Sequence, residues 1–158
     1  MGSNADRVIA NTRWRIESTS PTHQRPRKPF RWMDLAGVDA ENYPALRLFQ
    51  VLWLEEEDDE DSVTDLVERR AVHKILIEVA YADDYGLELR QEIMLQDRHD
   101  LIKTLRDPRL FAGTSASDPT GETGLQARRV TAARREFDDD ANMAILRIEC
   151  DCEIWETE

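Results

Sequence analysis

Cysteine, glycine and histidine are scarce in this 158-residue chain, which contains two, six and three of them. Two thiols without a nearby histidine or a further cysteine make a poor zinc site. The chain has no glycine-rich phosphate loop, no nucleophile elbow and no His/Cys cluster. We therefore expect no catalytic residue, no metal and no cofactor, and the sequence does not predict an enzyme.

Long apolar runs are also missing. No run approaches 18 apolar residues, and the first residues contain no apolar signal core. We therefore expect a soluble protein that is not secreted by that route and does not bind a membrane. Cys150 and Cys152 lie two apart in one predicted strand, with Cα atoms roughly 6.5 Å apart along it. A disulfide between them would be strained, so we interpret both as reduced, core-facing residues.

Charge is abundant, and it is divided unevenly along the chain. Residues 1–31 contain seven Lys/Arg and two Asp/Glu, a net charge of +5, whereas the whole chain carries −12. The other 127 residues therefore carry −17, and a body this acidic repels DNA. We do not expect direct nucleic-acid binding by the body. The basic residues near the beginning could contact phosphates, an acidic surface of another protein, or another copy of this chain.

The first 45 residues are interpreted as a basic N-terminal arm with short strands, separate from an α+β body at 46–158. Residues 1–11 are expected to be frayed or briefly helical. The alternation at 13–17 predicts a short strand, and a second short strand is predicted at 30–33. Three prolines between residues 18 and 29 predict an extended arm or loop outside the core.

The body shows alternation typical of strands and one stretch with helical spacing. Strands are predicted at about 46–55, 70–82, 125–137 and 143–155, and an amphipathic helix at about 85–106. The first two strands form a long β-hairpin. The predicted fold class is α+β, with a mostly antiparallel sheet of about four to five strands and one main helix on one face.

Two charged segments are candidate partner interfaces. The acidic one lies at the predicted hairpin tip and comprises Glu55, Glu56, Glu57, Asp58, Asp59, Glu60 and Asp61. It lacks the ligand spacing of a calcium loop. It is either a solvated, self-repelling loop or a docking surface for a basic partner, and a specific metal site is the least favoured reading. The basic segment comprises Arg25, Arg27, Lys28 and Arg31, with prolines and aromatic residues between them.

The order of the elements resembles that of a known family. An acidic-tipped hairpin is followed by a helix containing the sequence DRHDLIKTL at 97–105, then by a variable loop and a final hairpin with Trp155 near its end. This order resembles the tail-terminator (tail-completion) proteins of long-tailed bacteriophages. The resemblance covers roughly residues 46–158 and rests on patterns, not on a signature motif.

The resemblance implies a structural virion protein with no catalytic residues. It implies small subunits that close into a ring, expected to be a hexamer, on the last ring of the tail tube. The implied partners are further copies of the chain, the tail tube protein and the head–tail connector protein. The implied location is the tail or neck of the virion, after assembly in the host cytoplasm. The alternatives are a head-completion or connector (neck) protein, a non-viral interaction or nucleic-acid-associated protein, and an enzyme with a site built from scattered acids.

Overall fold

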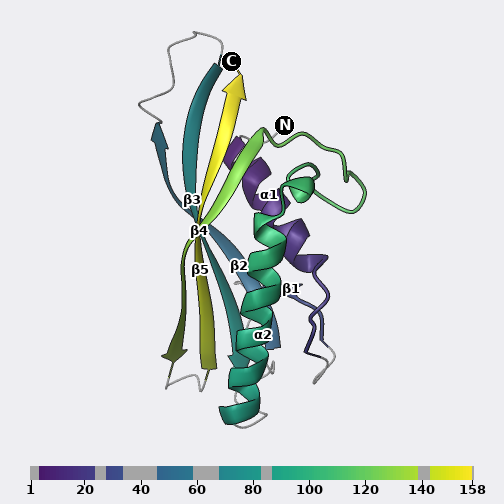
Figure 1. Cartoon of the computed structure of the whole chain (residues 1–158), viewed down its shortest axis with the longest axis vertical. Helices are drawn as coiled ribbons and strands as arrows, with labels where there is room; N and C mark the ends of the chain where they lie inside the picture. Colours follow the sequence, from purple (N-terminus) through teal and green to yellow (C-terminus); the bar gives the residue numbers. More distant parts are fainter. Residues whose placement is uncertain are drawn as a thin grey trace.

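The structure is a computed structural model that describes residues 4–23, 28–33, 46–58, 68–82, 87–138 and 143–157. The fold is α+β, and it has one five-stranded sheet in the order β1-β2-β3-β5-β4. Figure 1 shows the long strands beside the two helices. The elements are α1 (Asn4–Glu17), β1 (Arg31–Trp32), β2 (Leu46–Asp58), β3 (Glu68–Ala82), α2 (Leu87–Arg106), the 3₁₀ turn η1 (Pro108–Leu110), β4 (Leu125–Asp138) and β5 (Met143–Thr157).

The four long strands lie where alternation predicts them, and the hairpin prediction is confirmed. β2 and β3 pair antiparallel, with Val51 opposite Ile77. β3 and β4 both pair antiparallel with β5. The short strand expected at 30–33 is present as β1, and it runs parallel to β2. The sheet is therefore mixed at one edge and antiparallel elsewhere.

The strand predicted at 13–17 is wrong, because this segment is the last part of α1. Val8, Asn11, Thr12 and Ile16 are buried, and their spacing is that of one helix face. Val8 and Ile16 belong to the same hydrophobic core as the strands, and so does Phe30. α1 and Phe30 therefore contribute side chains to the core of the sheet. The division of the chain at residue 45 stays a prediction.

The helix predicted at about 85–106 is confirmed as α2, which ends two residues before Pro108. Its buried apolar residues lie on one face of the helix and belong to the core: Ile93, Met94, Leu101 and Leu105. Figure 1 shows both helices on one side of the sheet. Neither helix is long and apolar enough to cross a membrane.

The sheet face turned away from the helices carries cross-strand ion pairs. Arg147 of β5 reaches Glu78 of β3 at 3.2 Å and Glu136 of β4 at 3.1 Å. Arg70 reaches Glu153 at 3.0 Å.

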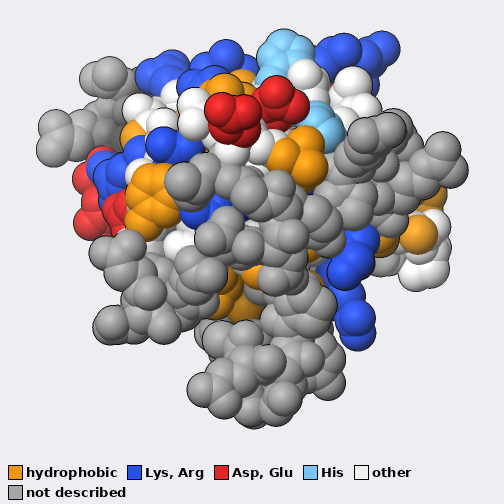
Figure 2. All heavy atoms as spheres, turned by 90° about the horizontal axis from the view of Figure 1, so that it is seen from below, with side chains coloured by type: hydrophobic (Ala, Val, Ile, Leu, Met, Phe, Trp, Pro, Cys, Tyr) orange, Lys and Arg blue, Asp and Glu red, His pale blue; other side chains and the backbone are white. Residues whose placement is uncertain are grey.

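Figure 2, seen from below Figure 1, shows basic, acidic and histidine side chains close together along one rim. The described side chains visible there do not form a patch of one sign.

Candidate functional site

The acidic segment lies at the end of a strand, at the edge of the sheet. Glu55, Glu56 and Glu57 are exposed residues of β2, which continues to Asp58. The prediction of a loop tip is therefore wrong for 55–58, because these residues pair with β3. Asp59, Glu60 and Asp61 lie outside the described residues.

One lysine is held by two of these glutamates. Lys74 Nζ lies 3.3 Å from an oxygen of Glu55 and 3.3 Å from an oxygen of Glu57. Hydrogen bonds from the ammonium group to Glu55 and then Glu57 raise the pKa of Lys74. The three groups are solvent-exposed enough that water screens the attraction, so the pairs add little to folding. Glu55 and Glu57 remain more than half exposed to solvent while they hold Lys74.

Large apolar side chains precede the acidic segment. Trp53 is 46% exposed and Leu54 is 47% exposed. The register shifts between Trp53 and Glu55, so Leu54 occupies a β-bulge. The indole Nε1 of Trp53 donates a hydrogen bond to Nδ1 of His73 at 3.1 Å, which holds the ring against the strand. Half-exposed tryptophan side chains of this kind are enriched at protein interfaces.

The opposite edge of the sheet, β4, is basic. Arg129, Arg134 and Arg135 are exposed. Arg134 reaches Glu136 at 3.0 Å and Glu149 at 3.7 Å. The guanidinium of Arg135 lies 4.7 Å from the ring centre of Phe137, which is itself 52% exposed. This edge thus presents both cations and apolar surface to solvent.

The fourth arginine of this strand is structural. Arg128 is buried, and its Nη2 donates to Oδ1 of Asn11 at 2.7 Å and to Oγ1 of Thr12 at 3.0 Å. Nδ2 of Asn11 in turn donates to the carbonyl oxygens of Phe111 at 3.2 Å and Gly113 at 2.7 Å. Asn11 therefore joins α1 to β4 and to the segment between α2 and β4.

The predicted basic segment is not brought to the acidic one. Arg25 and Arg27 lie outside the described residues. Lys28 and Arg31 are exposed, and Arg31 pairs with Leu48 on β2. Glu55 is seven residues further along β2, which is roughly 23 Å at the usual rise of a strand. Within one molecule, Arg31 therefore does not neutralise the acidic segment.

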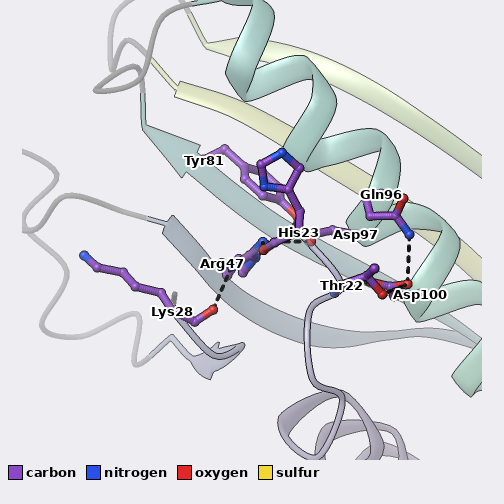
Figure 3. A network of polar contacts seen from close by, with 8 residues as sticks. All are labelled: Thr22, His23, Lys28, Arg47, Tyr81, Gln96, Asp97 and Asp100. Carbon is purple, nitrogen blue, oxygen red and sulfur yellow. Dashed lines mark hydrogen bonds and ion pairs between the residues drawn. The ribbon is translucent and has the colours of Figure 1, made fainter. Parts of the chain in front are cut away.

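A buried arginine fixes the chain that leads to β1, and sequence reasoning missed it. Arg47 is fully buried on β2. Its Nε donates to Oδ2 of Asp97 at 2.7 Å, and its Nη2 donates to Oδ1 at 3.1 Å. The hydroxyl of Tyr81 donates to the same carboxylate at 2.8 Å. Figure 3 shows these side chains converging between β2, β3 and α2.

The same guanidinium binds the backbone of the N-terminal segment. Nη1 donates to the carbonyl oxygen of Lys28 at 2.8 Å, and Nη2 donates to that of His23 at 3.1 Å. Nearby, the amide and hydroxyl of Thr22 donate to the two carboxylate oxygens of Asp100, each at 2.9 Å (Figure 3). We call Arg47, Asp97 and Tyr81 the Arg47 clamp. It joins both ends of the segment 23–28 to the sheet and to α2.

Burial removes water from the charged groups of the Arg47 clamp, which costs free energy. Burial raises the pKa of Asp97, and the hydrogen bonds and charge of Arg47 oppose that rise. Burial also raises the pKa of Tyr81 well above its usual value, so the phenol stays protonated and can donate its hydrogen bond. Arg47 has φ of 59°, a conformation that non-glycine residues rarely adopt. Surrounding contacts must therefore hold this residue in place.

The described residues do not bring together a metal-binding set. No group of three or more His, Cys, Asp or Glu side chains in this part of the chain could hold a metal ion. Of the predicted site residues that the structure describes, Glu55, Glu56 and Glu57 lie together on β2, whereas Lys28 and Arg31 lie elsewhere. The clamp had only a weak sequence signal, a single arginine inside the apolar stretch at 46–54.

The five-stranded sheet and its helices define the chain as an α+β protein. No family model and no curated protein matches it. Among solved structures, it is similar to a chain of the virion of a native gene transfer agent particle. That match has a TM-score of 0.62 at 12% sequence identity. It covers 99% of this chain and 100% of the other. The likeness establishes a common fold over the whole length, including α1.

Proposed function

We propose that this chain is a structural protein of a phage-like virion. The observation that carries the proposal is the full-length fold match to a chain of a gene transfer agent virion. The match covers both chains almost completely, so it compares whole subunits instead of one shared motif. The exposed, oppositely charged sheet edges fit a protein that works by contact with other proteins.

More specifically, we propose a tail terminator. This role would place a ring of copies, six in number, on the last ring of the tail tube and join that ring to the head–tail connector. The order of elements in the body supports this role, as described for the sequence. The proposed location is the tail or neck of the virion, after assembly in the host cytoplasm. The proposal assigns no catalytic residue to the chain.

The proposal predicts ring formation and selective binding to one end of a tail tube. Native mass spectrometry of the purified chain should show a closed oligomer, with six copies as the expected number. Electron microscopy with the particle's own tail tube protein should show one ring at a tube end. Tubes formed in the absence of the chain are the control, and they should lack the terminal ring.

Different failures have different meanings. A ring that binds the connector protein but no tail tube would favour the head-completion or neck role. A chain that binds neither protein, as a monomer or as an oligomer, would contradict a structural virion role.

A further inference from the structure

The sheet has two edges whose backbone groups are open to a partner. β1 is two residues long and pairs only with Leu48 and Phe49 of β2. Residues 50–58 of β2 therefore have no strand on that side within the described part of the chain. At the other edge, β4 pairs only with β5 among the described strands. Open edges of this length can accept a further strand.

These two edges carry opposite charge. Glu55, Glu56 and Glu57 are exposed on β2. On β4, Arg129 and Arg135 are exposed, and neither forms an ion pair with another described residue. Complementary charge speeds and orients docking, whereas two copies of the same edge would repel each other. The charges thus favour contact between unlike edges.

Apolar surface is present at both edges. A groove of about 290 Å³ between α2 and β4 is lined by Met94, Leu95, Ala133 and Leu146, with Arg98 and Arg135 also lining it. Leu95 of α2 is 58% exposed. The β2 edge supplies the half-exposed Trp53 and Leu54. Tryptophan and arginine are the side chains that most often dominate binding at protein interfaces.

We propose that the β2 edge at 50–58 docks on the β4 edge of a second copy of this chain. β2 runs antiparallel to β4 within the sheet, because each of the three long-strand pairings is antiparallel. Two copies side by side in the same orientation therefore bring β2 and β4 together as an antiparallel pair. Contact between two different surfaces repeats from copy to copy and closes into a ring if the rotation allows it. This contact is the one that would join neighbouring copies in the proposed ring. Only the closure of the copies into a ring rests on the proposed function.

Charge reversal tests this pairing. The first variant carries Arg129→Glu and Arg135→Glu, which makes the β4 edge acidic. The second carries Glu55→Lys, Glu56→Lys and Glu57→Lys together with Lys74→Glu, which makes the β2 edge basic and keeps opposite charges paired across β2 and β3. Each variant alone should self-associate at least about tenfold more weakly than the unmodified chain, measured by sedimentation and native mass spectrometry at low salt.

Mixing the two variants is the decisive step. The acidic β4 edge of the first variant fits the basic β2 edge of the second, and their unmodified edges fit in the other direction. The mixture should therefore assemble with alternating variants, at close to the original strength. Lys103→Glu with Arg106→Glu is the matched control, because it reverses two exposed charges of α2 that do not line the groove beside β4, and it should assemble normally. Circular dichroism checks that every variant is folded.

The outcomes separate this contact from the proposed function. If the reversals leave assembly unchanged, if the mixture fails to recover, or if the unmodified chain does not self-associate, the β2–β4 contact is wrong. Unchanged rings that still cap a tail tube would leave the virion role intact. Rings that respond as predicted but bind neither tube nor connector would support the contact and contradict the role.

Discussion

The Arg47 clamp and the edge of β2 use the same kind of charge pair in opposite surroundings. Arg47 and Asp97 have fully buried side chains and form two hydrogen bonds with each other. Lys74 and its two glutamates are partly exposed to water. Removing one partner of a buried pair typically costs about 3–5 kcal/mol, whereas an exposed pair contributes about 0–1 kcal/mol. The comparison teaches that the buried charge pair near the N-terminal segment serves folding, whereas the exposed charges at the β2 edge add little to stability.

The largest expected effect comes from breaking the buried pair. Arg47→Ala leaves the Asp97 carboxylate without its cation and leaves two backbone carbonyls without their donor. We expect the free energy of unfolding to fall by about 3–5 kcal/mol in urea titration. Arg31→Ala, at an exposed arginine of β1, is the control and should change it by less than about 0.5 kcal/mol.

A double-mutant cycle sharpens this result. Arg47→Ala combined with Asp97→Ala should cost less than the sum of the two single changes, because neither charge is then left buried alone. Additive losses would mean that the two side chains act independently and that the clamp is not a unit.

A smaller loss is expected when the buried junction around the uncharged Asn11 is broken. Asn11→Ala removes the donor to the carbonyls of Phe111 and Gly113 and the acceptor for Arg128. Leaving such buried groups unpaired costs about 1–3 kcal/mol. Thermal unfolding should show a lower Tm than for Ala10→Gly, a backbone control on the same helix that costs about 1 kcal/mol. A Tm at or above that of the control would show that α1 is not joined to β4 through Asn11.

At the exposed edge we expect assembly to change and stability to stay. Glu55→Gln with Glu57→Gln removes the partners of Lys74, and the free energy of unfolding should change by less than about 1 kcal/mol. Association, followed by light scattering at low ionic strength, should slow, and its salt dependence should flatten. Glu88→Gln with Glu122→Gln removes the same charge elsewhere and should have less effect. If both double variants slow association equally, the β2 edge acts only through the net charge of the chain and is not a specific contact.

The smallest effect near neutral pH is expected at the buried thiols. Burial and the neighbouring Cys152 raise the pKa of Cys150 to about 12. The folded pKa lies above the unfolded value, so stability from the protonated thiol is complete below about pH 8.5 and is lost as pH rises toward 12. Between about pH 6 and 8 the pH lies below both the folded and the unfolded pKa of Cys150, so the thiol is protonated in both states. The titration of Cys150 should therefore not change the free energy of unfolding over this range. Iodoacetamide at pH 8 should label both cysteines only after unfolding, and mass spectrometry measures the labelling. Rapid labelling of the native chain would contradict this expectation.

Regular alternation was enough to predict most of the sheet. β5 alternates buried apolar residues with polar ones from Leu146 to Ile154, and the structure places Cys150 and Cys152 in the core without a disulfide. α2 was equally readable, because its apolar residues recur with helical spacing and Pro108 follows it. The α1 segment was misread because two of its four buried positions, Asn11 and Thr12, are polar. A five-residue window at 13–17 is too short to separate alternation from helical spacing.

What the sequence by itself determined is the set of long strands, the hairpin, α2 and the acidic segment, because these depend on local periodicity and composition. Only the tertiary structure decided the Arg47 clamp and the opposite charge of the two sheet edges. Arg47 meets Asp97, which lies 50 residues away, and two backbone carbonyls that have no sequence signature. β4 is an edge because β5 follows it in the chain and inserts between β3 and β4. Such contacts depend on which distant segments the fold brings together, and local patterns carry no information about that.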